Sequence, residues 1–264
     1  MRIAESSAIV VGGASGLGEA TVRALHAQGA LVTIADVNAE KGSALASELE
    51  LDFVACDVRE EEQVQAAVTR AAEAQGGLRI AVCCAGTGWA QKVAGSKGPH
   101  PLMPFETIVS INLIGTFNVL RFAAAAMIVN EPAADGERGA CVNTASIAAF
   151  DGQVGQIAYS ASKGGVVAMT LPAARDLAQY GIRVNTIAPG MTVSGFTIRH
   201  IYEPDGSVNQ ERYDAFVERM RKLSPLGIVG EPIDQAYLIL YLASDAARFC
   251  TGVIWRANGG QSML

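Results

Sequence analysis

The residues of this sequence that are best suited to chemistry are Tyr159 and Lys163, with Ser146 thirteen positions before the tyrosine. At positions i and i+4 of a helix, two side chains share one face, about one turn apart. The ordinary pKa of tyrosine is about 10, and an ammonium about 4 Å away at an effective dielectric of about 20 favours the phenolate by about 4 kcal/mol. Lys163 is therefore expected to lower the pKa of Tyr159 and make it a general acid/base, while Ser146 binds the substrate oxygen. The alternative is an ordinary helix pair of one aromatic and one solvated side chain.

A glycine-rich turn follows the first expected strand, residues 6–12. The turn and the start of the next helix contain Gly12, Ser15, Gly16, Leu17 and Gly18. Glycines let the backbone approach a pyrophosphate, and the N-terminus of a helix, expected over 19–28, favours its negative charge. The alternative is a tight turn without a ligand.

Asp36 ends the second expected strand, Ala30 to Ala35, eighteen residues after Gly18. A carboxylate at this place can accept hydrogen bonds from both hydroxyls of an adenosine ribose. It would also repel a 2′-phosphate, and neither Ser15 nor Val37 supplies a compensating cation. The sequence therefore favours NAD(H) over NADP(H), unless Asp36 is only a solvated turn residue.

The next two strands are expected over Phe53–Val58 and Arg79–Gly86, with helices at 39–49 and 61–74. Asp57, near the end of the first, is placed either to contact adenine or to cap the following helix. Ala85 and Gly86 end the second and have little side-chain bulk, so a cofactor can lie across the strand ends. Residues 87–104 are expected to form an irregular surface loop beside the site.

The second half of the chain continues the alternation of helices and strands. A long helix from Phe105 places Asn112 in an apolar stretch, where its amide must be satisfied, either by a water relay from Lys163 or by a plain helix–helix hydrogen bond. A strand over 139–144 delivers Ser146 at its carboxyl end, the edge where open α/β sheets bind ligands. Strands at 181–190 and 252–255, and helices up to about 180 and over 233–242, complete the expectation.

Residues 191–224 interrupt this alternation with polar, aromatic and glycine residues and an amphipathic piece near 213–222. We expect a lid over the substrate here, with a disordered excursion as the alternative. The whole chain is expected to be one α/β domain, residues 1–264, with a Rossmann-type doubly wound parallel sheet.

Composition excludes several kinds of partner. Half of the 264 residues are hydrophobic, the net charge is −6 and no run of Lys or Arg is present, which argues against nucleic acid or an anionic membrane. Five cysteines have no metal-ligand spacing and indicate free thiols in a reducing compartment. No signal peptide is apparent, and no apolar segment is expected to span a bilayer, so the expected location is cytoplasmic.

These motifs together resemble the short-chain dehydrogenases/reductases over essentially the whole chain. The resemblance rests on G-G-A-S-G-L-G, Asp36, Cys84-Ala85-Gly86, Asn112, Ser146 with Y-S-A-S-K, and Pro189-Gly190. It implies a seven-stranded sheet, NAD, a homotetramer, and Asn112, Ser146, Tyr159 and Lys163 as the catalytic set. It also implies cofactor contacts at Ser15, Leu17, Asp36, Asp57, Val58, Cys84, Tyr159, Lys163 and Thr192.

Two positions depart from the pattern of the family. Val11 stands where a threonine usually braces the glycine turn, and Cys83 stands where an asparagine usually steadies the central strand. Both departures concern the scaffold and leave the chemistry intact.

Within the family, the sequence around Ser146 and Tyr159 looks like the type II 3-hydroxyacyl-CoA dehydrogenases, a group also described as type 10 17β-hydroxysteroid dehydrogenases. We therefore expect NAD-dependent interconversion of a secondary alcohol and a ketone, with an acyl-CoA as the first candidate substrate. A hydroxysteroid or other hydrophobic alcohol comes next, and a 3-oxoacyl-carrier-protein substrate is disfavoured by Asp36. A non-catalytic NAD-binding scaffold and a thiol redox protein using Cys83 and Cys84 are the alternatives of another class.

Overall fold

Seven parallel strands form the central sheet of the computed structural model, which describes residues 2–74, 76–193, 201, 203, 205 and 207–262. Their order is β3-β2-β1-β4-β7-β8-β9. The strands are β1 (Ser7–Val11), β2 (Leu31–Asp36), β3 (Asp52–Ala55), β4 (Leu78–Cys83), β7 (Gly139–Thr144), β8 (Ile182–Ile187) and β9 (Ile254–Trp255). The chain moves outward in one direction from β1 to β3 and in the other from β4 to β9, so the strand order reverses between β1 and β4. Ligands bind at such a reversal in doubly wound sheets.

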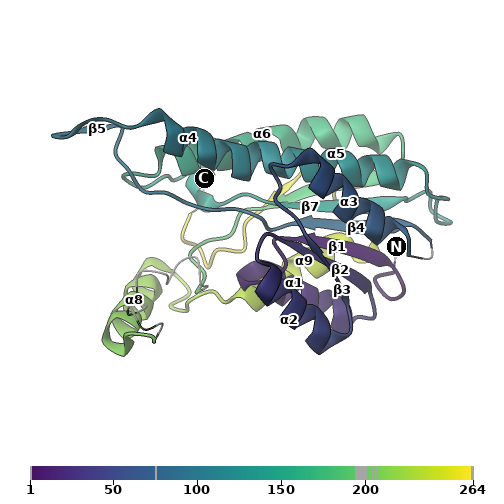
Figure 1. Cartoon of the computed structure of the whole chain (residues 1–264), viewed down its shortest axis with the longest axis horizontal. Helices are drawn as coiled ribbons and strands as arrows, with labels where there is room; N and C mark the ends of the chain where they lie inside the picture. Colours follow the sequence, from purple (N-terminus) through teal and green to yellow (C-terminus); the bar gives the residue numbers. More distant parts are fainter. Residues whose placement is uncertain are drawn as a thin grey trace.

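Helices cover both faces of the sheet (Figure 1). One layer consists of α1 (Gly16–Ala27), α2 (Ala39–Leu49) and α9 (Pro232–Ala243). The other consists of α3 (Glu61–Ala72), α5 (Gly115–Ile128) and α6 (Ile157–Ala178). The expected single α/β domain with a doubly wound seven-stranded sheet is confirmed.

The core divides into two clusters, one on each face of the sheet. In β1, Ile9 and Val11 pack towards the layer of α3 and α5, whereas Ala8 and Val10 pack towards α1 and α9. Because both faces are covered, the central strands are continuous apolar runs without alternation. This double burial makes the sheet a rigid support for the loops at its carboxyl edge.

The long helix begins earlier than expected and has a local irregularity. It starts at Leu102, after Pro101, so that α4 (Leu102–Val109) includes residues expected to be loop. A five-residue π-helix, η1 (Ser110–Ile114), then joins α4 to α5 and contains Asn112. Such π-turns widen the helix by one residue and are frequent at functional sites.

The expectation that no segment could span a membrane is wrong by length and composition. The 27 residues Leu102–Ile128 pass that test, although half of the apolar window is buried inside the fold. Contacts with α3, with α6 and with strands β4 and β7 of the sheet account for this burial. A buried core helix of a globular domain has the same composition, so the segment is read here as core.

Three further segments differ from their expected form. Residues expected as irregular loop contain a small antiparallel hairpin, β5 (Ala94–Gly95) with β6 (Gly98–Pro99). Strand β3 ends at Ala55, because this edge strand pairs only with Thr33–Asp36 of β2. The amphipathic piece of the expected lid is α8 (Gln210–Leu223), which lies apart from the two helical layers in Figure 1; residues 194–200, 202, 204 and 206 of that lid lie outside the described part.

Candidate active site

The glycine turn after β1 is packed too tightly for side chains. A Cβ on Gly18 would lie 1.9 Å from the carbonyl oxygen of Gly12, and one on Gly12 (φ +78°) would lie 2.5 Å from the backbone nitrogen of Ala85. Gly16, Leu17 and Gly18 form the first turn of α1. Ser15 precedes the helix, and its exposed hydroxyl does not cap it. The N–H groups of this first turn have no carbonyl partner within the helix.

Asp36 lies at the end of β2, against the same turn. Its two carboxylate oxygens accept hydrogen bonds from the backbone N–H groups of Ala14 (3.0 Å) and Asn38 (2.9 Å). The following residue, Val37, is exposed. The carboxylate is therefore held in one orientation beside the glycine turn, with an apolar neighbour.

Asp57 follows β3, and its carboxylate is paired with a neighbouring side chain. Its carboxylate accepts from the guanidinium of Arg59 at 2.5 Å, and this hydrogen bond lowers the pKa of Asp57. The residue that precedes α3 as its cap is Glu60. The helix-capping alternative is therefore wrong. Val58 is buried, and its carbonyl accepts from Asn118.

Cys84, Ala85 and Gly86 continue from β4 along the same edge. Gly86 is exposed, and a Cβ there would lie 3.3 Å from both Lys163 Nζ and Asn112 Oδ1. The thiol of Cys84 accepts from the hydroxyl of Thr144 at 3.7 Å. Burial raises the pKa of Cys84 to about 12, which leaves no reactive thiolate for thiol redox chemistry.

Tyr159 and Ser146 meet in the structure as the sequence predicts. Ser146 follows β7 in extended conformation, and its hydroxyl oxygen accepts from the backbone N–H of Ala148. Tyr159 lies in the first turn of α6 and is hydrogen-bonded to the side chain of Ser146. A hydroxyl pair of this kind can hold one substrate oxygen from two sides.

Lys163 lies one turn further along α6 and is buried. Its Nζ donates to the backbone carbonyl of Thr144 at 2.7 Å and lies 5.9 Å from the centre of the Tyr159 ring. Burial lowers the pKa of Lys163 to about 8, an effect opposed by the nearby Cys83 and Cys84. The lysine is thus anchored to the strand end beside the tyrosine.

The expected direction of the tyrosine pKa is not found in this arrangement. Burial raises the pKa of Tyr159, and the hydrogen bond with Ser146 opposes the rise. Desolvation of the phenol, which spacing along a helix does not reveal, is therefore the larger influence on this pKa.

Asn112 is completely buried, and its amide makes three hydrogen bonds. Oδ1 accepts from the backbone N–H of Thr87 at 2.8 Å, and Nδ2 donates to the carbonyl of Thr87 (2.8 Å) and to Ser162 Oγ (3.0 Å). Ser162 in turn donates to the carbonyl of Tyr159 at 2.7 Å. The amide therefore holds the segment after β4 against the helix of Tyr159, which is the structural alternative expected from the sequence.

Pro189, Gly190 and Thr192 follow β8 at the same edge. The carbonyl of Pro189 accepts from the backbone N–H of Ile147, next to Ser146. Thr192 is buried and forms a parallel bridge with Gly230. Most of the predicted site residues thus come from strand ends, loops or helix starts at one edge of the sheet. Asn112 comes from the middle of a long helix and is bonded to Thr87 at that edge.

Three contacts at this edge could not be predicted from the sequence. The carbonyl of Thr144 holds Lys163, the backbone of Thr87 holds Asn112, and the side chain of Gln261 holds Met191. The first two use backbone atoms, which carry no residue-type signal. Ser162 was visible as part of Y-S-A-S-K, but only the fold shows what it contacts.

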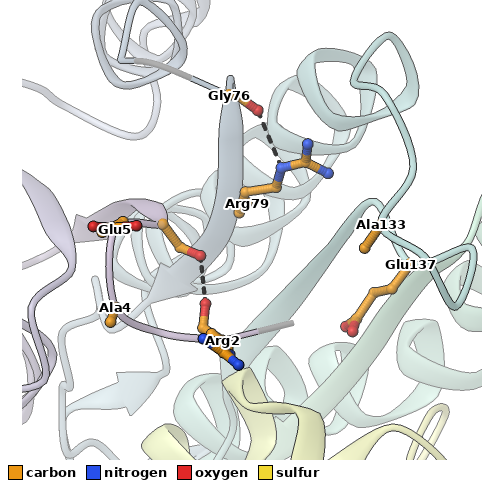
Figure 2. Close-up of a pocket in the computed structure, with 8 residues that line it drawn as sticks. Arg2, Ala4, Glu5, Gly76, Arg79, Ala133 and Glu137 are labelled. Atoms are coloured by element: carbon orange, nitrogen blue, oxygen red, sulfur yellow. Dashed lines mark hydrogen bonds between the residues drawn. The ribbon is translucent and has the colours of Figure 1, made fainter.

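Two hollows lie at the opposite edge and contain none of these residues. One, of about 220 Å³, is lined by Arg2, Glu5, Arg79 and Glu137, among others (Figure 2). The guanidinium of Arg79 donates to carbonyls, including that of Gly76, and Glu137 pairs with the buried Arg183 at 2.9 Å. The second, of about 730 Å³, shares Glu137. Their charged groups hold strand starts together, so we assign the chemistry to the carboxyl edge.

A dinucleotide fits the residues at the carboxyl edge. The close approach of Gly12 and Gly18 makes a turn that only glycine permits, beside the N-terminus of α1. The carboxylate of Asp36 is held next to this turn by the backbone N–H of Ala14. Gly86 is exposed and has no side chain to cover the end of β4. The switch in strand order, the glycine turn and the Ser146, Tyr159 and Lys163 cluster define a nicotinamide-dependent oxidoreductase that acts on CH–OH groups.

Comparison with known proteins agrees with this class. A model of the family described as enoyl-(acyl carrier protein) reductase matches residues 12–262. The chain belongs to the short-chain dehydrogenase/reductase family.

Several relatives share a name. The protein named 3-hydroxyacyl-CoA dehydrogenase type-2 is 41% identical in Drosophila melanogaster, over 99% of each chain. Its namesake in Bos taurus is 52% identical over 70% of this chain and 72% of its own. A crystal structure of 3-hydroxyacyl-CoA dehydrogenase type-2 from Mycobacterium avium has a TM-score of 0.87 at 40% identity, covering 98% of this chain and 97% of that one. A 2,5-dichloro-2,5-cyclohexadiene-1,4-diol dehydrogenase of Sphingobium indicum is 36% identical over 96% of this chain and 95% of its own.

Proposed function

We propose that this protein oxidises a 3-hydroxyacyl-CoA to the 3-oxo thioester with NAD, and catalyses the reverse reaction with NADH. The observation that carries the proposal is the hydrogen-bonded pair of Ser146 and Tyr159, with Lys163 one helical turn away. The bound nicotinamide supplies a two-electron acceptor for the hydride that leaves the alcohol carbon.

The residues of the chain handle the proton. Ser146 Oγ orients the substrate hydroxyl, and the phenolate oxygen of Tyr159 accepts its proton as the carbonyl forms. Lys163, held by Thr144, adds positive charge that favours this phenolate and is placed to bind the nicotinamide ribose. The side-chain amide of Asn112 is hydrogen-bonded to Thr87 and Ser162, so we propose that Asn112 holds the site together. The water of the proton relay is proposed to lie beside it.

NAD is proposed over NADP because of Asp36. Its carboxylate is fixed by Ala14 and Asn38, where it would accept from ribose hydroxyls and repel a 2′-phosphate. The remaining cofactor contacts are proposed at the glycine turn, at 57–58, at 84–86, and at Pro189, Gly190 and Thr192. The carboxylate of Asp57 is paired with the guanidinium of Arg59. An adenine bound at this position would therefore contact an ion pair and not a free carboxylate.

An acyl-CoA is proposed because several relatives carry that name, and because of the charge of the hairpin arm, residues 91–101. The arm contains Lys92, Lys97 and His100 and no acidic residue. It is joined to the segment before Tyr159 by a hydrogen bond from the N–H of Gln91 to the carbonyl of Gly155, 2.8 Å. A cationic arm beside the site suits a phosphorylated substrate better than a steroid. A hydrophobic cyclic alcohol is the second candidate substrate, because the relative from Sphingobium is named as a cyclohexadienediol dehydrogenase.

A substrate panel tests the proposal. NADH formation at 340 nm should be fastest with a 3-hydroxyacyl-CoA and NAD, slower with the matching N-acetylcysteamine thioester, and absent in Tyr159→Phe, which should still bind NADH. Lys92→Ala with Lys97→Ala should raise the KM for the CoA ester and leave that of the short thioester unchanged. Faster turnover of cyclic alcohols or steroids would support the second candidate, and cofactor binding without any turnover would support a scaffold.

We also propose a homotetramer, a cytoplasmic location and a lid formed by residues 191–224. Large apolar side chains are exposed on two separate sets of elements: Ile114 and Phe117 on one helical layer, and Tyr237, Phe249 and Val253 around α9 and β9. Two such faces suit the two interfaces of a tetramer with dihedral symmetry. Light scattering of the purified protein tests the assembly, and Phe117→Arg should reduce its mass.

A further inference from the structure

The C-terminal turn, residues 257–262, is tied together by its own hydrogen bonds. Asn258 Nδ2 donates to the carbonyl of Ser262, and Asn258 Oδ1 accepts from the backbone N–H of Gly260. Gly259 and Gly260 both have positive φ, which side chains rarely adopt. The turn is fastened to α9 by Gln235, whose Nε2 donates to the carbonyl of Ala257 at 2.7 Å.

One side chain of this turn reaches the loop after β8. Gln261 Oε1 accepts the backbone N–H of Met191 at 2.7 Å, in a partly buried position. The contact is close, since a Cβ on Gly190 would lie 2.6 Å from the same oxygen. Because a backbone N–H can only donate, the amide oxygen of Gln261 must face the loop.

The same turn also holds the other end of the 191–224 segment. The carbonyl of Gly259 accepts from Ser224 Oγ (3.2 Å) and from the backbone N–H of Leu226 (3.3 Å). A parallel bridge between Thr192 and Gly230 closes the base of the excursion. The start and the end of the proposed lid therefore rest on one support.

We infer that Gln261 is a positioning residue for the nicotinamide half of the cofactor site, acting through the backbone of Gly190 and Met191. The inference rests on the proposed function, which assigns Pro189, Gly190 and Thr192 to the cofactor site and the nicotinamide ribose to Lys163. The carbonyl of Pro189 accepts from Ile147, next to Ser146, and we therefore place the nicotinamide half at the turn after β8. The adenosine half is proposed at β1 and β2, at the other end of the site. Loss of the Gln261 contact should therefore weaken one half of the binding and leave the other unchanged.

Binding of two probes distinguishes the halves: NADH, and ADP-ribose, which lacks the nicotinamide. In Gln261→Leu, which has similar size and no acceptor, the Kd for NADH should rise about tenfold, the effect of one ordinary hydrogen bond. The Kd for ADP-ribose should stay within about twofold of wild type. Gln261→Glu retains an oxygen acceptor and should restore NADH affinity.

Ser262→Ala is the matched control in the same turn, because the hydroxyl of Ser262 is buried and has no hydrogen-bond partner among the described residues. It should bind both probes as wild type does. If Gln261→Leu does not fold, Gln261→Asn decides, because its shorter side chain withdraws the amide oxygen from Met191 and should give the same selective loss of NADH affinity.

Equal losses for both probes, or no loss for either, would overturn the inference. A wild-type protein that binds ADP-ribose and not NADH, or neither, would contradict the proposed function itself. The two failures are therefore distinguishable.

Discussion

The ammonium nitrogen of Lys163 lies 2.7 Å from the backbone carbonyl oxygen of Thr144, the last residue of β7. This hydrogen bond satisfies one of the three donors of a buried charge and fixes its place beside Tyr159. The same burial lowers the pKa of Lys163 to about 8. Burial of the charged lysine therefore destabilises the fold, and the position of Lys163 at the site explains why a lysine is present here.

Replacing Lys163 with methionine should stabilise the protein at pH 7 while abolishing turnover. A pKa lowered from 10.5 to about 8 means that the buried charge destabilises the folded protein by about 3 kcal/mol. Loss of the hydrogen bond to Thr144 destabilises the variant by about 1 kcal/mol. A net gain of about 2 kcal/mol in the free energy of unfolding is expected, measured with urea.

The pH dependence of this gain follows from linkage. Between pH 8 and 10.5 the unfolded wild type binds more protons at Lys163 than the folded protein, so the stability of the wild type rises with pH through that window. The advantage of Lys163→Met should therefore be largest below pH 8 and vanish before pH 10.5, where only the lost hydrogen bond remains. Lys41→Met, at an exposed position of α2, is the control, and a variant less stable than wild type at pH 7 would contradict the argument.

Ser146→Ala should shift the acidic limb of the pH profile for alcohol oxidation to higher pH. The hydrogen bond from Ser146 opposes the rise in the pKa of Tyr159 that burial causes, so its removal raises that pKa further. Less phenolate is then present at any given pH, and kcat/KM falls. The limb position, measured from pH 6 to 10.5, separates this effect from a simple loss of substrate orientation, which would lower the rate without moving the limb.

Asp36→Ala should lower the ratio of kcat/KM for NAD to that for NADP by about tenfold or more, because the repulsion of a 2′-phosphate and the bonds to the ribose are lost together. Glu40→Ala, an exposed acid in the first turn of α2, is the matched control for charge. An unchanged ratio in Asp36→Ala would show that this carboxylate only braces the glycine turn through Ala14.

Ser162→Ala and Ser160→Ala should differ in stability although they lie two residues apart on α6. Ser162 is completely buried, donates to the carbonyl of Tyr159 and accepts from Asn112, so its loss leaves Asn112 Nδ2 with one partner fewer. A loss of about 1–3 kcal/mol is expected in urea unfolding. Ser160 Oγ is buried without a partner among the described residues, and its removal should cost nothing. Equal effects would mean that the Asn112 bond contributes no stability.

Local patterns predicted most of the fold and the place of the site. Buried strands such as β7 and β8 are continuous apolar runs, and the i,i+4 spacing of Tyr159 and Lys163 holds on a real helix. Positions after strand ends, such as Asp36 and Ser146, could be assigned to one edge because all strands are parallel.

What the sequence could not predict depends on burial and on backbone atoms. The pKa of Tyr159 moves opposite to the expected direction, because desolvation is a property of the folded site. The π-turn that carries Asn112 has no local sequence signal. Asp57 was expected at adenine or as a cap, and its pairing with Arg59 depends on a rotamer that spacing does not specify.

The departure at Cys83 does have a visible cost in the structure. Cys83 stands in register with Asn143 on the neighbouring strand, and Asn143 Nδ2 is buried without a partner among the described residues. The thiol instead donates to the hydroxyl of Thr116 at 3.7 Å. The side-chain amide of Asn143 is therefore left unsatisfied, whereas the hydrogen bond between Ser146 and Tyr159 is intact.

The closed base of the excursion after β8 makes it separable from the rest of the enzyme. Thr192 and Gly230 are already joined to each other, and the chain between them enters and leaves beside the same C-terminal turn. The proposed lid predicts that a loop exchanged within 193–230 changes which alcohols are accepted while the strand ends stay in place. Loop exchange at Thr192 and Gly230, followed by a comparison of substrates, is therefore a direct test of the proposed lid.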